Sequence, residues 1–257
     1  MRKYIVLIAV GAIALASASF AVAGEETQTE TASITPAKLS KKKPQSISFT
    51  NTIATASEAS TGQPKSATRT ILDLPKQFKV NPKSMPTCKS DATGLANAPT
   101  TSAAIAACGK GSQVTDPHGT SAQVTVGRGP GNAPGYIDVE VTGFNAKGNV
   151  LLLYAKPTGA ASGLPATILT GQLKSYDQVK GRPADAKANK SASKQSLDVV
   201  IPPIAAGAIS NFEVTIAKSS YIKAKCSPST MTVQATSMFT DGSHTVDSDT
   251  IQCKPKK

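Results

Sequence analysis

The 257-residue sequence predicts an all-β fold: an antiparallel β-sandwich, immunoglobulin-like or jelly-roll-like, with one short helix and two local disulfides. Three observations lead to this prediction. Apolar and polar residues alternate over short runs, which is typical of half-buried strands. Gly and Pro residues separate these runs, and the four cysteines fall into two pairs that are each close in sequence.

The first 23 residues have the pattern of a secretory signal peptide. Arg2 and Lys3 provide the positive charge, residues 4–16 are apolar, and the small residues of Ala21-Val22-Ala23 precede Gly24. All four cysteines follow this segment. We therefore expect a secreted protein, extracellular or associated with the cell envelope. No later apolar run reaches the roughly 20 residues that span a bilayer, so we expect no transmembrane anchor in the mature chain.

Residues 24–44 contain mainly Thr, Ser, Glu, Lys and Pro, and this composition predicts a disordered arm. Residues 45–257 are expected to form a single β-sandwich domain. The alternation predicts strands at residues 46–50, 68–74, 122–126, 136–142, 150–154, 167–175, 197–201, 212–216, 231–239 and 245–251.

Three segments support this arrangement most clearly. In 136–142, Ile137, Val139 and Val141 share one face, whereas 150–154 is apolar throughout and is expected to be buried on both faces. Asp241-Gly242 predicts a hairpin turn, because Gly and Asp tolerate the positive φ that such turns need. Residues 101–108 predict the short helix, since a capping residue precedes them and Gly109 follows.

The four cysteines allow three pairings, and the strand pattern supports Cys88 with Cys108 and Cys226 with Cys253. The second pair would clasp the open end of the last hairpin. Loop closure predicts that each bridge stabilises the fold by about 3–4 kcal/mol. The spacing of a CxxC redox motif is absent, so both disulfides are expected to be structural.

The chain is basic, with a net charge of +12 that falls to +10 when Arg2 and Lys3 are lost with the signal peptide. Such a charge favours contact with acidic partners. Basic residues concentrate at Lys41 to Lys43, over residues 174–194, and at the C-terminal Lys254, Lys256 and Lys257. Except for Lys174, the second concentration lies in residues 176–196, which lack an apolar face and are expected to form a long, mobile, basic loop. Apart from Tyr176, no aromatic residue interleaves with these positions, so no nucleic-acid partner is predicted.

No catalytic, cofactor-binding or metal site is predicted, and no cofactor is expected. Asp241, Ser243 and His244 contain the residue types of a hydrolase triad, but the sequence has no GxSxG elbow. His118, the other histidine, lies in a turn sequence. Asp241, Asp247 and Asp249 offer oxygen ligands for calcium without EF-hand spacing, so we expect Asp247 and Asp249 to mark a solvent-facing side of their strand.

Residues 74–88 run from Leu-Pro through Asn-Pro and Pro to Cys88, and residues 107–114 contain Cys108 and Ser-Gln-Val. This pattern resembles that of uncharacterised secreted and surface β-sandwich proteins of actinobacteria. Gly109 and Thr115 stand where that pattern has Pro and Gly. The last hairpin, with Cys253, is similar to the same group. The resemblance implies an exported β domain and provides no catalytic residues to transfer.

Together these features predict an exported, non-catalytic structural or interaction module of the cell envelope or extracellular space. Its expected partners are acidic envelope polymers, contacted through the basic surface, or another envelope protein. Two alternatives remain open. One is a secreted hydrolase with an unrecognised site near His118 or His244. The other is a carbohydrate-binding module, although a chain without Trp offers few aromatic platforms.

Overall fold

A computed structural model of the chain describes residues 26–57, 63–116, 120–128, 134–204, 207–217 and 219–256. The predicted signal peptide, the first two residues of the predicted arm and His118 lie outside the described residues.

The described chain is built mainly from β-strands, with short helices between them. The strands are β1 (Glu26–Thr35), β2 (Lys38–Leu39), β3 (Gln45–Ser46), β4 (Ser48–Ser57), β5 (Ala67–Pro75), β6 (Phe78–Val80), β7 (Ser121–Arg128), β8 (Pro134–Ala146), β9 (Val150–Pro157), β10 (Thr167–Ser175), β11 (Ser193–Val200), β12 (Ala208–Ile216), β13 (Ile222–Ala224), β14 (Thr230–Phe239), β15 (His244–Gln252) and β16 (Lys254–Pro255). The helices are α1 (Ala92–Ala96) and α2 (Thr101–Cys108), with 3-10 turns η1 (Pro82–Ser84), η2 (Lys110–Ser112), η4 (Gly159–Ala161), η5 (Tyr176–Gln178) and η6 (Asp185–Ser191).

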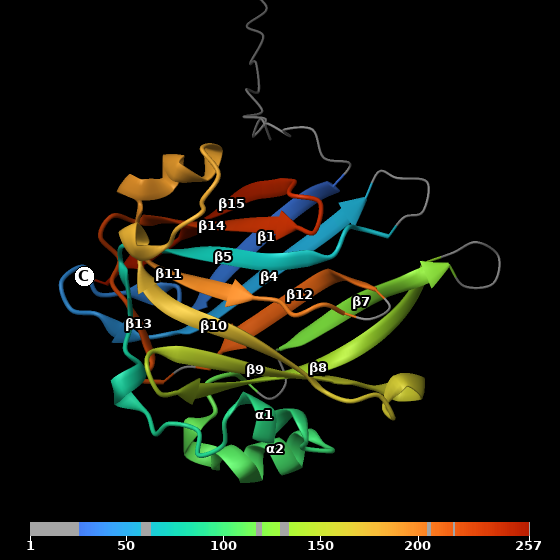
Figure 1. The fold of residues 1–257 in the computed structure, drawn as a ribbon. Helices are drawn as coiled ribbons and strands as arrows, with labels where there is room; N and C mark the ends of the chain where they lie inside the picture. The colour runs from blue at the N-terminus through green and yellow to red at the C-terminus, as the bar shows by residue number, and fades with distance from the viewer. Residues whose placement is uncertain are drawn as a thin grey trace, which may run out of the picture.

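Eleven strands form one antiparallel sheet in the order β1-β4-β12-β7-β8-β9-β10-β11-β5-β14-β15. This sheet, here called the rolled sheet, curves until β1 and β15 lie side by side and its two halves face each other (Figure 1). The backbone N–H groups of Glu30 and Ala32 donate to the carboxylates of Asp247 and Asp249, at 2.7 and 2.8 Å. We call this contact the seam. The predicted fold class, antiparallel and mostly β with two disulfides, is confirmed.

The main core lies between the two halves of the rolled sheet, where alternate residues of each strand point inward. Val139 and Val141 are buried there, as the alternation of 136–142 predicts, and they meet Leu151 and Leu153 of β9. The turns between strands use residues that tolerate a positive φ. Gly242 lies at φ +85° in the predicted hairpin turn. The period-two pattern therefore identified most of the strands that enclose the core.

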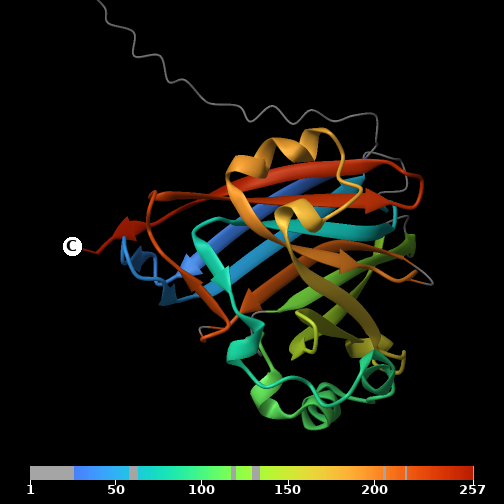
Figure 2. The same ribbon diagram turned by 60° about the vertical axis from the view of Figure 1, so that its left-hand side comes forward.

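A second, smaller core lies on the outer side of β9, where α1 and α2 cover the sheet (Figure 2). Leu152 and Tyr154 point into it, and the Tyr154 hydroxyl donates to the carbonyl of Ala98 at 2.8 Å. The prediction that 150–154 is buried on both faces is confirmed. Helix α2 has the predicted bounds, and the Thr100 hydroxyl caps it by accepting from the Ala103 N–H. Helix α1 was not predicted, because its five residues are too few to show a helical period.

The prediction of a disordered arm over residues 24–44 is wrong for the described part of that segment. Residues 26–35 form β1, which pairs with β4 along its whole length, and β2 follows. Only Glu26, Glu30 and Ile34 of β1 are buried, so its composition resembles that of a polar linker. Backbone hydrogen bonds and the seam, rather than apolar burial, hold this strand in place.

Residues 176–196, predicted as a mobile basic loop, instead form η5, η6 and the start of β11, packed against the outer face of the sheet. Arg182 forms a two-pronged ion pair with the fully buried Asp73 of β5, both N···O distances being 2.6 Å. Its guanidinium carbon also lies 4.1 Å from the centre of the Tyr176 ring. Arg182 thus anchors residues 176–196 to the sheet. The sequence-based prediction missed this because a segment rich in Lys, Ala and Ser gives no sign that one of its basic residues is buried.

Both predicted disulfides are formed, Cys88 with Cys108 and Cys226 with Cys253, and no described cysteine is free. The first closes the segment that carries α1 and α2. The second joins the chain just before β14 to the chain just after β15, at the open end of the hairpin. The predicted clasp is therefore confirmed.

Candidate functional site

The strongest candidate site is a face of nine lysines, seven exposed and two (Lys223 and Lys225) half-buried, around the open end of the last hairpin. Two small sheets build it. In the first, β16 pairs in parallel with β2, so that Lys254 lies beside Lys38. In the second, β13 pairs with β3 and β6, and Lys223 lies opposite Lys79. These elements gather beside the C-terminus in Figure 1.

Buried neighbours and backbone hydrogen bonds fix this end of the molecule. Leu39, Ile47 and Ala224 are fully buried beneath it, together with the Cys226–Cys253 disulfide. The N–H groups of Lys254 and Lys256 donate to the carbonyls of Ala37 and Leu39, at 2.8 and 2.7 Å. With the apolar positions of these segments turned inward, their lysines lie at the surface.

Nine lysines on or next to β2, β6, β13 and β16 define what we call the lysine face; Lys76 and Lys83, in the segment around β6, are not counted among them. No Asp or Glu occurs in residues 36–47, 76–83, 219–229 or 252–256, which contribute to it or flank it. Within the part of the chain that the structure describes, none of its lysines forms an ion pair. Its members are Lys38, Lys41, Lys42, Lys43, Lys79, Lys223, Lys225, Lys254 and Lys256.

The basic stretch at 174–194 differs, because acidic partners compensate part of its charge. Asp198 forms two ion pairs, with Lys174 at 2.7 Å and with Arg69 at 2.6 Å. These two cations lower the pKa of Asp198, although burial alone would raise it. Lys190 pairs with Asp177 at 2.9 Å, and Arg182 with the buried Asp73. Lys180, Lys187 and Lys194 of this stretch form no ion pair with described residues, so its charge is compensated only in part, whereas that of the lysine face is not compensated by ion pairs at all.

Asp241, Ser243 and His244 lie close together, but their contacts differ from those of a triad. The N–H and hydroxyl of Ser243 both donate to Asp241, at 2.9 and 2.6 Å, and Lys65 pairs with the same carboxylate at 2.9 Å. These donors lower the pKa of Asp241. His244 instead contacts Asp185 of η6 at 3.2 Å. The serine hydroxyl points to the aspartate rather than to the histidine, so the three residues do not form a nucleophile–base pair in this conformation.

The sequence predicts that Asp247 and Asp249 mark a solvent-facing side of their strand, and this prediction is wrong. Both are half-buried, and each accepts a backbone N–H of β1 across the seam. Edge strands leave such N–H groups unpaired, and here aspartate side chains satisfy them. Among the described residues, no group of three or more acidic, His or Cys side chains is arranged to hold a metal ion.

Two comparisons with known proteins were negative. No protein-family model matches the chain, and no curated protein matches its sequence. In the described part of the chain, no helix is long and apolar enough to cross a membrane. The two disulfides are consistent with an extracellular protein.

Sequence reasoning identified two of the lysine concentrations of this face but could not join them. Lys41 to Lys43 and Lys254 to Lys256 lie at opposite ends of the chain. The pairing of β2 with β16, which brings them together, involves strands of only two residues each. A two-residue strand shows no alternation, so the available signal was the disulfide that places Cys253 beside Cys226.

Proposed function

We propose that the chain is an exported, non-catalytic interaction module that binds acidic polymers of the cell envelope through its lysine face. The observation that carries this proposal is the grouping of nine lysines, with no acidic residue in their segments and no ion pair among described residues. Secretion, which the leader sequence predicts, belongs to the same proposal.

The chemistry of the face suits a flexible polyanion better than a single small anion. Lysine ammonium groups act as point charges on long stems and can follow a chain of carboxylates or phosphates. At physiological salt, exposed charges interact over about 8 Å, so binding to such a surface must weaken as salt rises. Many weak contacts along one polymer chain would together give a higher overall affinity than any single contact.

The test compares two variants with equal loss of charge. The mature chain is applied to immobilised polyphosphate, poly-glutamate and purified cell walls, and salt elution is measured. The face variant is Lys41→Gln with Lys42→Gln and Lys43→Gln, and we expect it to elute at clearly lower salt. The slope of log affinity against log salt should fall by roughly 2 to 3 in magnitude. The reason is that the variant makes three fewer ionic contacts and so releases fewer counterions when it binds.

The matched control variant is Lys180→Gln with Lys187→Gln and Lys194→Gln, which removes three exposed lysines outside the face. We expect it to elute close to the unchanged protein. Equal shifts for the two variants would mean that only net charge matters, and the face would then have no special role. Retention that ignores ionic strength would contradict the whole proposal.

A further inference from the structure

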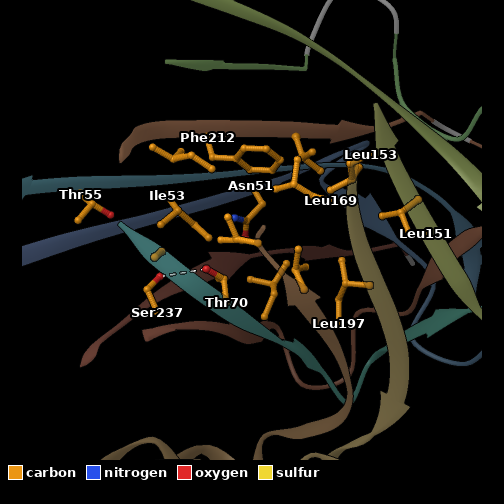
Figure 3. Close-up of a pocket in the computed structure, with 16 residues that line it drawn as sticks. Asn51, Ile53, Thr55, Thr70, Leu151, Leu153, Leu169, Leu197, Phe212 and Ser237 are labelled. Atoms are coloured by element: carbon orange, nitrogen blue, oxygen red, sulfur yellow. Dashed lines mark hydrogen bonds between the residues drawn. The ribbon is translucent and has the colours of Figure 1, made fainter. Parts of the chain in front are cut away.

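The rolled sheet encloses an apolar cavity that the lysine face does not use. The cavity measures about 70 Å³ and lies between β4 and β12 on one side and β5, β9, β10 and β11 on the other (Figure 3). Most of its lining is aliphatic. Leu151, Leu153, Leu169 and Leu197 point into it from three neighbouring strands, and the Phe212 ring lies beside Leu169.

Four of the residues that line the cavity are polar, namely Asn51, Thr55, Thr70 and Ser237, and three of them bond to other protein groups. Thr70 and Ser237 bond to each other at 3.2 Å, the contact drawn in Figure 3. The Asn51 amide donates to Glu30. A buried water needs two to four polar partners, which this lining does not offer, and apolar cavities of this kind stay dry and accept apolar molecules.

A larger groove of about 310 Å³ adjoins the cavity and shares Leu169, Ile209 and Phe212 with it. Strands β7 and β8 form one wall, and residues after β9 and β11 form the rim. Leu164 at this rim is 49% exposed, so it can be changed without disturbing the core. The groove and the cavity meet at the three apolar residues that they share, and together we call them the apolar path.

We propose that this path binds one slender, uncharged hydrocarbon molecule, such as a fatty alcohol or an isoprenoid alcohol. The groove volume is at the low end of small-molecule sites, which span about 300–1,000 Å³, and this excludes bulky ligands. Among the described residues, no charged side chain lines either space. Moving an ionised head group into such a lining carries a large unpaired desolvation cost, so fatty acid anions and alkylammonium ions are rejected.

The test uses the mature chain and N-phenyl-1-naphthylamine, an uncharged probe that fluoresces in apolar surroundings. We expect saturable fluorescence that 1-dodecanol or farnesol displaces, while dodecanoate and dodecylammonium fail to displace it. Displacement by 1-dodecanol alone would identify a straight-chain ligand, and displacement by farnesol alone would identify an isoprenoid ligand. Equal displacement by dodecanoate would overturn the requirement for an uncharged ligand.

Two variants of exposed apolar residues make the location testable without disturbing the core. Leu164→Glu places a charge in the path, and we expect it to weaken probe binding by about tenfold or more. The matched control is Val200→Glu, which changes another exposed apolar residue, 57% accessible, that lines neither space. It should leave binding unchanged. Equal effects of the two variants, or no probe binding at all, would overturn the proposal.

A core variant tests whether the Phe212 ring, which lines both spaces, separates the groove from the cavity. Phe212→Ala removes the ring between groove and cavity, and we expect it to tighten probe binding several-fold. Circular dichroism confirms that the variant is folded. If the folded variant binds the probe no better than the unchanged protein, the groove and cavity do not act as one site.

Discussion

At the residue scale, Glu30 is the most unusual ionisable group that the structure describes. Glu30 is 4% exposed, and among described groups only the Asn51 amide bonds to its carboxyl group. Burial raises its pKa from 4.5 to about 9, and the nearby carboxylates of Asp247 and Asp249 add to this effect. Glu30 is therefore protonated in the folded protein at neutral pH, which keeps an unpaired charge out of the core.

This protonation predicts how stability depends on pH. Between pH 4.5 and about 9 the folded chain holds a proton on Glu30 that the unfolded chain releases. The contribution of Glu30 to the unfolding free energy must therefore fall as pH rises through this window. Glu30→Gln keeps a neutral side chain of the same shape, so we expect a higher Tm than the unchanged protein at about pH 8 and a similar Tm at about pH 5. Calorimetry at both values checks this, and an equal difference at both would refute the role of Glu30.

At the element scale, residues 176–196 show how one ion pair can fix a polar segment. Arg182 contacts both carboxylate oxygens of Asp73, and the Ser196 hydroxyl donates to the same carboxylate at 2.6 Å. Gln234 of β14 adds a bond to the carbonyl of Ala186 at 3.0 Å. With few apolar side chains to bury, the segment depends on these polar contacts for its place on the sheet.

We expect Arg182→Ala to lower the unfolding free energy by about 3–5 kcal/mol, because it leaves the carboxylate of Asp73 buried without its partner. The same variant should expose residues 176–196 to trypsin. Urea denaturation and limited proteolysis measure the two effects. The double variant Asp73→Leu with Arg182→Met removes both charges and should be clearly more stable than Arg182→Ala. A double variant as unstable as the single one would show that the loss comes from packing rather than from the unpaired charge.

At the scale of the whole molecule, the disulfide between Cys226 and Cys253 links stability to the lysine face. Lys225 and Lys254 are the chain neighbours of its two cysteines, and β16 begins directly after it. The other disulfide lies with α1 and α2, away from this face. The two bridges close loops of similar length, with separations of 27 and 20 residues. They form a natural pair for comparison.

We expect replacement of either cysteine pair by serine to cost about 3–4 kcal/mol of unfolding free energy by loop-closure entropy. Only Cys226→Ser with Cys253→Ser should also weaken retention on polyanions, because it loosens the pairing of β16 with β2. Cys88→Ser with Cys108→Ser is the control that loses stability and keeps retention. Salt elution below the unfolding temperature separates these outcomes, and equal loss of retention in both variants would contradict the link.

The sequence by itself determined the strands with regular alternation, the helix at residues 101–108 and both disulfide pairs. These features arise from local rules: side chains alternate along a strand, caps end a helix, and a hairpin brings its flanking cysteines together. Only the tertiary structure decided that polar β1 is a strand, that Arg182 anchors residues 176–196, and that two distant lysine groups share a face. Each depends on a partner far along the chain, such as β4 for β1, Asp73 for Arg182 and β2 for β16. Pairings over such distances leave no period in the local sequence, because the residues that form them are chosen by contact in space.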